Sequence, residues 1–495
     1  MTASDAPSAQ AAAARTGHQA AWNYLVFALS KISTLIMTVA LARLLSPEDF
    51  GLFALALLVV TLFDCVKDLG VGGALVQSRA PLRSLAPTAL TISLVSGLVV
   101  GCVVFAAADL FAGLFGRAEL APMIRALAVG LVISAVSTVP ASLLRRRIAF
   151  RERLVPEVGG ALAKTVVAIA LAVAGVGVWS LVYAQLVAVV VNTSLYWWRA
   201  GVAPRWGFSR PTAVELTRFG VPVAAITLLA FAIYNVDYLA VGLRVGTADL
   251  GLYSLAYRLP ELIILNLCSV VSDVLFSSLS RMQDEPERLR EHYLRALSVV
   301  IAITAPIGTL LAVMAPEVIQ VLFGPRYAAA GDALTVIALF TVVYSASFHS
   351  GDVYKAIGRP GILTAINAGK LLVMAGPVWW AAGHGMLAVA LVLLGVEVVH
   401  LGVRLGVVAR IAGLSLSTLL GSAGRPVLAS VVMAGPLVAF ARLSPELPAL
   451  ARLMIAAPLA LASYAIALRF AAPNLVREAL AVGRAVVAKR AGAVS

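Results

Sequence analysis

Residues 87–108 read PTALTISLVSGLVVGCVVFAAA, a run without a charged side chain. An α-helix needs about 20 residues to cross a hydrocarbon core of roughly 30 Å. Because backbone polar groups find no water in that core, they must be satisfied within the segment, as in a helix. A barrel strand would be about ten residues long with alternating polarity, which this run does not show. The run therefore predicts a transmembrane helix.

Similar apolar segments recur along the whole chain. Of its 495 residues, 61% are hydrophobic and 13% are charged, whereas a soluble domain has about half its residues apolar and about a quarter charged. The predicted fold class is therefore an all-α polytopic membrane protein with about 14 transmembrane helices. The predicted spans are residues 20–43, 50–76, 87–108, 123–144, 159–178, 180–198, 218–243, 250–280, 293–316, 329–354, 360–382, 384–408, 424–441 and 449–471.

The basic residues are distributed unevenly between alternate loops. If the amino terminus lies inside, 26 of the 38 Lys and Arg residues fall in inside segments and 7 in outside segments. Because cytoplasmic loops carry the excess of Lys and Arg, both termini are predicted to be cytoplasmic in a multi-pass protein of the bacterial inner membrane. The net charge of +14 then reflects topology and contact with anionic phospholipid, so nucleic acid is not an expected partner.

Two sequence landmarks occur twice. DFGLFALA at residues 49–56 is matched by DLGLYSLA at 249–256, and LFGR at 114–117 is matched by LFGPR at 322–326. Six predicted spans separate the copies, and an even number returns the chain to the same side of the membrane. The sequence therefore predicts two parallel-repeat lobes of six helices, followed by two C-terminal helices.

This repeat gives the predicted domain organisation. The domains are a disordered cytoplasmic tail over 1–19, an N-lobe over 20–200, a C-lobe over 201–410, the last two helices over 411–472 and a cytoplasmic tail over 473–495.

Several short motifs resemble one known family. They are ARLLSPEDFGL at 42–52, DLG at 68–70, LVQ at 75–77, GLYSLAYRL at 251–259, VLF at 274–276 and LSRMQDEPERL at 279–289. Together they are similar to the polysaccharide transporter family, which contains Wzx-type flippases and exopolysaccharide exporters. This family belongs to the multidrug/oligosaccharidyl-lipid/polysaccharide exporter superfamily.

The resemblance implies a fold and an activity. The fold would be two six-helix bundles around a central cavity, working by alternating access. The substrate would be an undecaprenyl-diphosphate-linked oligosaccharide, carried across the inner membrane for exopolysaccharide or lipopolysaccharide biosynthesis. The expected partners are this lipid-linked oligosaccharide, the phospholipid membrane and a polysaccharide polymerase.

Five cations lie inside predicted spans, where charges are costly and usually face a cavity or a partner. They are Lys31, Lys67, Lys164, Arg258 and Lys370. Lys31 and Lys370 have no carboxylate one turn away, so they are the first candidates to bind an anionic head group. Lys67 and Arg258 are also candidates, but an ion pair with Asp64 or Glu261 would neutralise them. Lys164 is expected to reach toward the cytoplasmic interface instead.

Buried acids and histidines are candidates for proton coupling, because they can change charge near neutral pH. Glu397 and His400 lie with Arg404 on one helix face, and Asp237 and Asp64 are two further acids within spans. The alternative for the first group is a structural network between helices.

Two amides on another span are candidate ligands for sugar hydroxyls. Gln185 and Asn192 share a face with Tyr196 in span 180–198. Such side chains also commonly join helices to one another, which is the alternative interpretation.

No enzyme motif is evident in the sequence. It contains no phosphate-binding Gly-rich loop, no metal-ligand spacing and no nucleophile elbow. We therefore expect no enzymatic activity, no cofactor and no metal. Two other transport functions stay open: a lipid II flippase, which would share 14 spans and a cationic cavity, and an ion-coupled multidrug exporter, which would have an acidic cavity.

Overall fold

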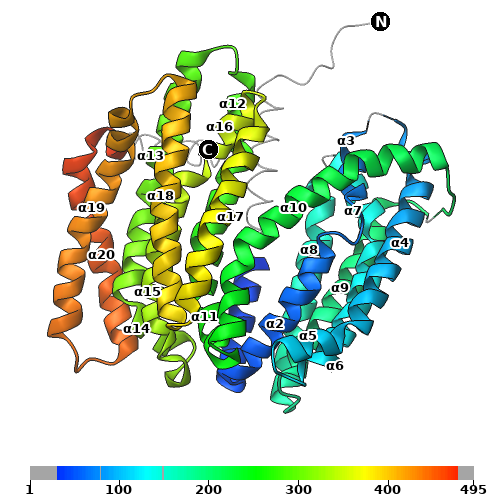
Figure 1. Cartoon of the computed structure of the whole chain (residues 1–495). Helices are drawn as coiled ribbons and strands as arrows, with labels where there is room; N and C mark the ends of the chain where they lie inside the picture. The colour runs from blue at the N-terminus through cyan, green and yellow to red at the C-terminus, as the bar shows by residue number, and fades with distance from the viewer. Residues whose placement is uncertain (1–29, 79, 148–149, 204, 478–495) are drawn as a thin grey trace, which may run out of the picture. The chain divides into compact units, whose positions relative to one another are not determined.

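The computed structural model describes residues 30–78, 80–147, 150–203 and 205–477. Within these ranges every regular element is a helix (Figure 1). The predicted all-α class is therefore confirmed. The predicted tail over 1–19, the first ten residues of the first span and most of the tail over 473–495 lie outside the described residues.

The chain divides into two compact units: the first ends at Leu243 and the second begins at Arg244. The first unit begins with a helix over residues 30–44. Its other helices are α2 (Pro47–Asp64), α3 (Val71–Gln77), α4 (Leu82–Ala106), α5 (Ala108–Leu114), α6 (Leu120–Val136), α7 (Thr138–Arg146), α8 (Phe150–Val173), α9 (Trp179–Ala200) and α10 (Arg210–Arg244).

The second unit contains the remaining helices. They are α11 (Thr247–Pro260), the π-helix η1 (Glu261–Leu265), α12 (Asn266–Arg281), α13 (Pro286–Val313), α14 (Ala315–Leu322), the 3-10 helix η2 (Pro325–Tyr327), α15 (Ala330–Phe348), α16 (Ser350–Ala356), α17 (Pro360–Ala382), α18 (Met386–Ala412), α19 (Leu416–Leu443) and α20 (Ala449–Ala471).

The first sequence landmark starts a helix in both units. Asp49 and Asp249 each occupy the third position, in α2 and α11 respectively. In α2, Ser46 and Asp49 form a capping box, in which Ser46 Oγ accepts from the Asp49 amide and Asp49 Oδ2 accepts from the Ser46 amide. This satisfies two of the amides that a helix start leaves open and places a carboxylate at the positive end of the helix dipole.

The second landmark ends a short helix in both units. α5 stops at Leu114 and α14 at Leu322, and the next glycine adopts a positive φ in each case, 64° at Gly116 and 96° at Gly324. The repeated sequence therefore builds the same local structure twice. The order of long and short helices from α4 to α9 also recurs from α13 to α18.

α10 belongs to the first compact unit, although the repeat counts it as the first helix of the C-lobe. Its Leu216 is buried among Val71, Leu75 and Leu85 of α3 and α4. The boundary between the compact units lies after Leu243, whereas the boundary between the sequence repeats lies before α10. The lobe boundary at 200/201 stays a prediction.

Eleven of the described helices are long and apolar enough to cross a membrane, and twelve if the bent pair α6 and α7 counts as one span. Each of these overlaps a predicted span. The two other predicted spans correspond to the helix over residues 30–44 and to α2 with α3. The protein is a multi-pass membrane protein, and the count of 14 stays a prediction.

The predicted span over 50–76 contains a break between two helices. α2 ends at Asp64, and α3 starts only at Val71. The intervening turn contains Lys67 and Asp68, and the Asp68 carboxylate accepts hydrogen bonds from the backbone N–H groups of Gly70 and Gly72. The span predicted over 50–76 therefore consists of two helices joined by a turn, in which the Asp68 carboxylate accepts from amides at the start of α3.

The last two helices pack onto the second unit. In Figure 1, α19 and α20 run beside α13, and Tyr464 of α20 donates a hydrogen bond to the Ala302 carbonyl of α13 at 2.8 Å. At the other end of α20, Arg452 forms an ion pair with Glu317 of α14 at 2.6 Å. α20 is thus attached to the rest of the second unit by contacts at two positions along its length.

Candidate functional site

A cavity in the first unit contains several of the predicted site residues. Its volume is about 240 Å³, and it lies between α2, the turn after it, α6 and α9. We call it the N-unit cavity. Its polar lining residues are Thr61, Asp64, Lys67, Ser134 and Gln185, and its apolar walls include Leu57, Val60, Leu127, Leu131, Leu186 and Val189.

Lys67 is the cation of this cavity. Its Nζ donates to Asp64 Oδ1 and to Ser134 Oγ, at 2.6 Å in each case. The Lys67 side chain is 12% exposed, whereas the Asp64 side chain is 47% exposed. The ion pair considered for Lys67 therefore forms, but its carboxylate faces open space, where a competing anion could replace it.

A second ammonium lies beside the cavity. Lys164 of α8 donates from Nζ to Gln185 Oε1 at 2.7 Å, and the same nitrogen lies 5.8 Å from the Phe53 ring centroid. The lysine therefore bonds to an amide of the neighbouring helix. Gln185, which lines the cavity, thus connects its polar side to Lys164.

The other candidates of the first unit do not line this cavity. Asn192 lies two turns beyond Gln185 and packs so closely on Gly160 that a Cβ there would meet its Oδ1 at 1.9 Å. Lys31 is half-buried on the first described helix, and Asp237 is buried in α10. Their predicted roles are not tested by this geometry.

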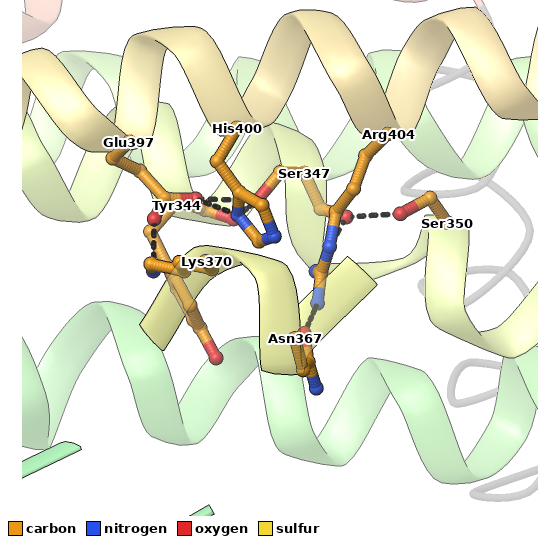
Figure 2. A network of polar contacts seen from close by, with 8 residues as sticks. All are labelled: Tyr344, Ser347, Ser350, Asn367, Lys370, Glu397, His400 and Arg404. Atoms are coloured by element: carbon orange, nitrogen blue, oxygen red, sulfur yellow. Dashed lines mark hydrogen bonds and ion pairs between the residues drawn. The ribbon is translucent and has the colours of Figure 1, made fainter. Parts of the chain in front are cut away.

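The second unit holds a buried polar network that joins α15, α17 and α18. We call it the C-unit network, and Figure 2 shows its side chains pointing toward one another from the three helices. Its members are Ser347 of α15, Asn367 and Lys370 of α17, and Glu397, His400 and Arg404 of α18.

Glu397 is the centre of this network. Its Oε2 accepts from Lys370 Nζ at 2.5 Å, and its Oε1 accepts from Ser347 Oγ at 2.8 Å. The Nδ1 of His400 lies 3.4 Å from the same Oε1. The Lys370 and Glu397 side chains are 6% and 0% exposed, so this is a fully buried ion pair. A buried charge pair of this kind is costly to break, because either partner alone is left without compensation.

Arg404 extends the network by two further contacts. It donates to the Ser347 carbonyl at 3.1 Å and to Asn367 Oδ1 at 2.9 Å. Its own carbonyl accepts from the buried Tyr354 hydroxyl. The predicted coupling residues Glu397 and His400 therefore share one network with Lys370, which the sequence had placed in a substrate-binding role.

Two smaller polar clusters lie in the same unit. Asp352 accepts from Ser272 Oγ at 2.7 Å and from Lys355 Nζ at 3.1 Å, and one of its oxygens lies 3.2 Å from His349 Nδ1. Arg258 forms its expected pair with Glu261 at 3.1 Å, where α11 passes into the π-helix η1. Its role in substrate binding stays a prediction.

Sequence reasoning missed the partners that come from other helices. Ser134 on Lys67, Asn367 on Arg404 and Ser347 on Glu397 had not been singled out. The only signal in the sequence was that each is a polar residue inside an apolar run. Among the described residues, no three His, Cys, Asp or Glu side chains gather as a metal site.

The family follows from comparison with known proteins. Residues 40–331 match the family described as polysaccharide biosynthesis protein, which is more than half of the chain. The protein therefore belongs to this family, and the resemblance seen in the sequence motifs is confirmed.

Curated relatives agree with the family. The chain is 28% identical over 357 residues to the succinoglycan biosynthesis transport protein ExoT of Rhizobium meliloti, covering 72% of each chain. It is 24% identical over 342 residues to the lipopolysaccharide biosynthesis protein WzxC of Escherichia coli, covering 68% of this chain and 69% of that one.

A solved structure agrees on the fold. The lipid II flippase MurJ, in an inward closed conformation, superposes with a TM-score of 0.76 at 13% identity, covering 92% of this chain and 99% of that chain. The protein is thus a membrane protein of polysaccharide biosynthesis with the fold of a transporter.

Proposed function

We propose that this protein translocates an undecaprenyl-diphosphate-linked oligosaccharide across the bacterial inner membrane by alternating access, for exopolysaccharide or lipopolysaccharide biosynthesis. The supporting observation is the N-unit cavity, which presents Lys67 and Gln185 within a unit of membrane-spanning helices. A diphosphate needs a cation, and sugar hydroxyls need amides or hydroxyls as hydrogen-bond partners. No catalytic step is part of this proposal, and a polysaccharide polymerase would receive the product outside.

In this proposal the head group competes with Asp64 for Lys67. Because the Asp64 carboxylate is half-exposed, its separation from Lys67 costs little. The diphosphate would then bind the Lys67 ammonium and the Ser134 hydroxyl in its place. A hydrogen bond to a charged group contributes about 1.5–3 kcal/mol. Loss of the Lys67 contact is therefore expected to weaken binding roughly ten- to a hundredfold.

The C-unit network supplies a coupling element. Protonation of Glu397 would release the Lys370 ammonium, which would then be available to an anionic substrate group. The charged or titratable groups around the pair are His400 on Glu397, Arg404 through Ser347, and Tyr344, whose ring centroid lies 5.8 Å from Lys370 Nζ. In this way the same pair connects a coupling proton with head-group binding.

The test is a translocation assay with purified protein in vesicles. The probe is a polyprenyl-diphosphate-linked oligosaccharide with a fluorophore on the sugar, quenched from outside by membrane-impermeant dithionite. Lys67→Gln is expected to lower the initial rate at least tenfold. The matched control is Arg125→Gln, which removes the cation of another ion pair of the first unit, with Asp109, away from the cavity. A rate for Lys67→Gln equal to wild type would refute the cavity as the head-group site.

The same vesicles distinguish the alternative functions. Equal or faster translocation of lipid II would favour the cell-wall flippase. Translocation of an organic cation, without any of the lipid-linked oligosaccharide, would favour a multidrug exporter. In cells, deletion is expected to abolish surface polysaccharide and leave lipid-linked repeat units at the cytoplasmic face, while cell-wall synthesis continues.

A further inference from the structure

The first unit contains a second and larger cavity, of about 430 Å³, which the proposed transport cycle does not use. It lies between α4, α7, the end of α9 and the segment that follows α9. Two arginines, Arg147 and Arg205, and one tryptophan, Trp197, line it together with apolar side chains of α4 and α7. We propose that this Arg/Trp cavity is a binding site for the phosphate group of a membrane lipid.

The two arginines are available to an anion. Arg147 donates from Nη1 to the Ala200 carbonyl at 3.2 Å, which holds its guanidinium at the end of α9. Within the described part of the chain, no carboxylate forms an ion pair with Arg147 or Arg205. A guanidinium has five N–H donors in a planar fork that matches phosphate oxygens, so most of the donors of this pair are open to a ligand.

Two neighbouring arginines, Arg146 and Arg153, are instead bonded to other groups of the protein. Arg146 donates to the Ala80 and Leu75 carbonyls and so joins α7 to the end of α3. Arg153 pairs with Glu157 at 2.8 Å. The basic cluster around the end of α7 is therefore not a uniform charged surface, because Arg146 and Arg153 are bonded to other groups whereas Arg147 lines a cavity.

The rest of the wall is apolar. Leu90 of α4 and Val139 of α7 belong to a buried cluster on which Trp197 packs. Trp206 and Phe208, just beyond the cavity, are each 66% exposed. Exposed aromatic side chains of this kind favour the headgroup zone of a bilayer. A cavity with cations and apolar walls suits a phosphate that carries an alkyl ester better than it suits a free inorganic ion.

The segment carrying Arg205 is held in place by α4. Thr91 Oγ1 donates to the Gly207 carbonyl at 3.0 Å, and Thr88 Oγ1 accepts from the Ser209 amide at 3.1 Å. Gly207 lies so close to Pro87 that a Cβ on it would be 3.1 Å from the proline Cβ. These contacts hold the chain just after Arg205 against α4.

The predicted topology assigns this cavity to the membrane face where anionic lipids concentrate. Arg147 and Arg205 both fall in segments predicted to be cytoplasmic, and that leaflet attracts basic residues. Two sources carry the required chemistry: an anionic phospholipid, and the diphosphate of a polyprenyl-linked sugar waiting at the inner face. Both place a lipid phosphate between the two guanidinium groups.

The test measures lipid retention by the full-length protein in detergent with native mass spectrometry. Phosphatidylglycerol is the first probe, and diacylglycerol, which lacks phosphate, is the lipid control. We expect the double variant Arg147→Gln/Arg205→Gln to bind phosphatidylglycerol at least tenfold more weakly than wild type. Arg145→Gln is the matched control, because Arg145 is exposed, adjacent in sequence and not part of the cavity. Thermal unfolding without added lipid confirms that each variant is folded.

Further probes identify the source and can overturn the proposal. Displacement of phosphatidylglycerol by polyprenyl diphosphate at lower concentration would assign the site to the lipid-linked substrate; failure to displace it would assign the site to phospholipid. Unchanged binding by the folded double variant, equal retention of diacylglycerol, or equally tight binding of inorganic phosphate alone would refute a lipid-phosphate site. None of these outcomes depends on translocation, so the proposed function can fail or stand independently.

Discussion

The ammonium of Lys370 lies 2.5 Å from a carboxylate oxygen of Glu397, and both side chains are buried in the second unit. The two residues stand on neighbouring helices, α17 and α18, and 27 positions separate them in the chain. Each was predicted to have a separate role, one in head-group binding and one in coupling. Their contact means that neither charge can change without affecting the other.

The first prediction concerns the stability of this pair. Lys370→Met leaves Glu397 as a buried charge without its main partner, and breaking a buried pair in this way costs about 3–5 kcal/mol. The double variant Lys370→Met/Glu397→Gln removes both charges and should recover most of that loss. Thermal unfolding of the purified proteins in detergent measures both. A double variant that is less stable than the single one would show that Lys370 and Glu397 do not compensate each other.

The second prediction concerns coupling. Glu397→Gln imitates the protonated carboxyl group, so Lys370 stays released whatever the proton gradient. Translocation by this variant in vesicles, normalised to the amount of protein, should no longer respond to an imposed gradient. Glu285→Gln serves as the control, since Glu285 forms an exposed pair with Arg288 and should leave the response unchanged. A wild-type response of Glu397→Gln would remove Glu397 from the coupling mechanism.

Much of the fold could be predicted because it depends on local sequence. Apolar runs of membrane length predict helices, and the capping box at Ser46 and Asp49 and the glycine after Leu114 act within a few residues. The glycine signal is present in both copies of the repeat, and the capping box only in the first. The break after Asp64 was missed because a hydropathy pattern does not show that the Asp68 carboxylate can cap a new helix within the apolar run.

The candidate site was less predictable, since its geometry depends on contacts between helices. Residue type and depth within a span drew attention to Lys67, Gln185 and Glu397, whose roles stay predictions. The sequence could not show that Lys164 would reach Gln185, or that Lys370 would meet Glu397 across two helices. The pair of Lys67 with Asp64 was foreseen from its three-residue spacing, although Lys67 lies in the turn after α2 and not within the helix.

The third prediction concerns the attachment of the last two helices. Arg452 of α20 pairs with Glu317 of α14 at 2.6 Å, and it also donates to the Ala441 carbonyl of α19. The Glu317 side chain is 6% exposed. Glu317→Ala should therefore lower stability by about 3–5 kcal/mol, because the arginine loses its partner in a buried place.

The control for this prediction is an exposed pair in the same unit. Arg288 and Glu285 lie 2.8 Å apart with side chains 59% and 50% exposed. Exposed pairs contribute roughly 0.2–1 kcal/mol, so Glu285→Ala should leave the thermal unfolding midpoint nearly unchanged. Equal effects of the two alanine variants would mean that burial does not strengthen the Glu317 contact.

The fourth prediction concerns a close backbone approach between α10 and the turn after α2. A Cβ on Gly220 of α10 would lie 2.3 Å from the carbonyl oxygen of Leu69, a backbone atom that has no side-chain freedom to move aside. Gly220→Ala must therefore push α10 away from the turn that carries Lys67, and overpacking of this kind costs about 1–3 kcal/mol. Both the unfolding midpoint and the translocation rate should fall. Gly113→Ala is the matched control: Gly113 lies in α5 with no atom within 4 Å of the added Cβ, so alanine should be neutral or slightly stabilising. A Gly220→Ala protein with normal stability and normal translocation would show that this contact does not position the N-unit cavity.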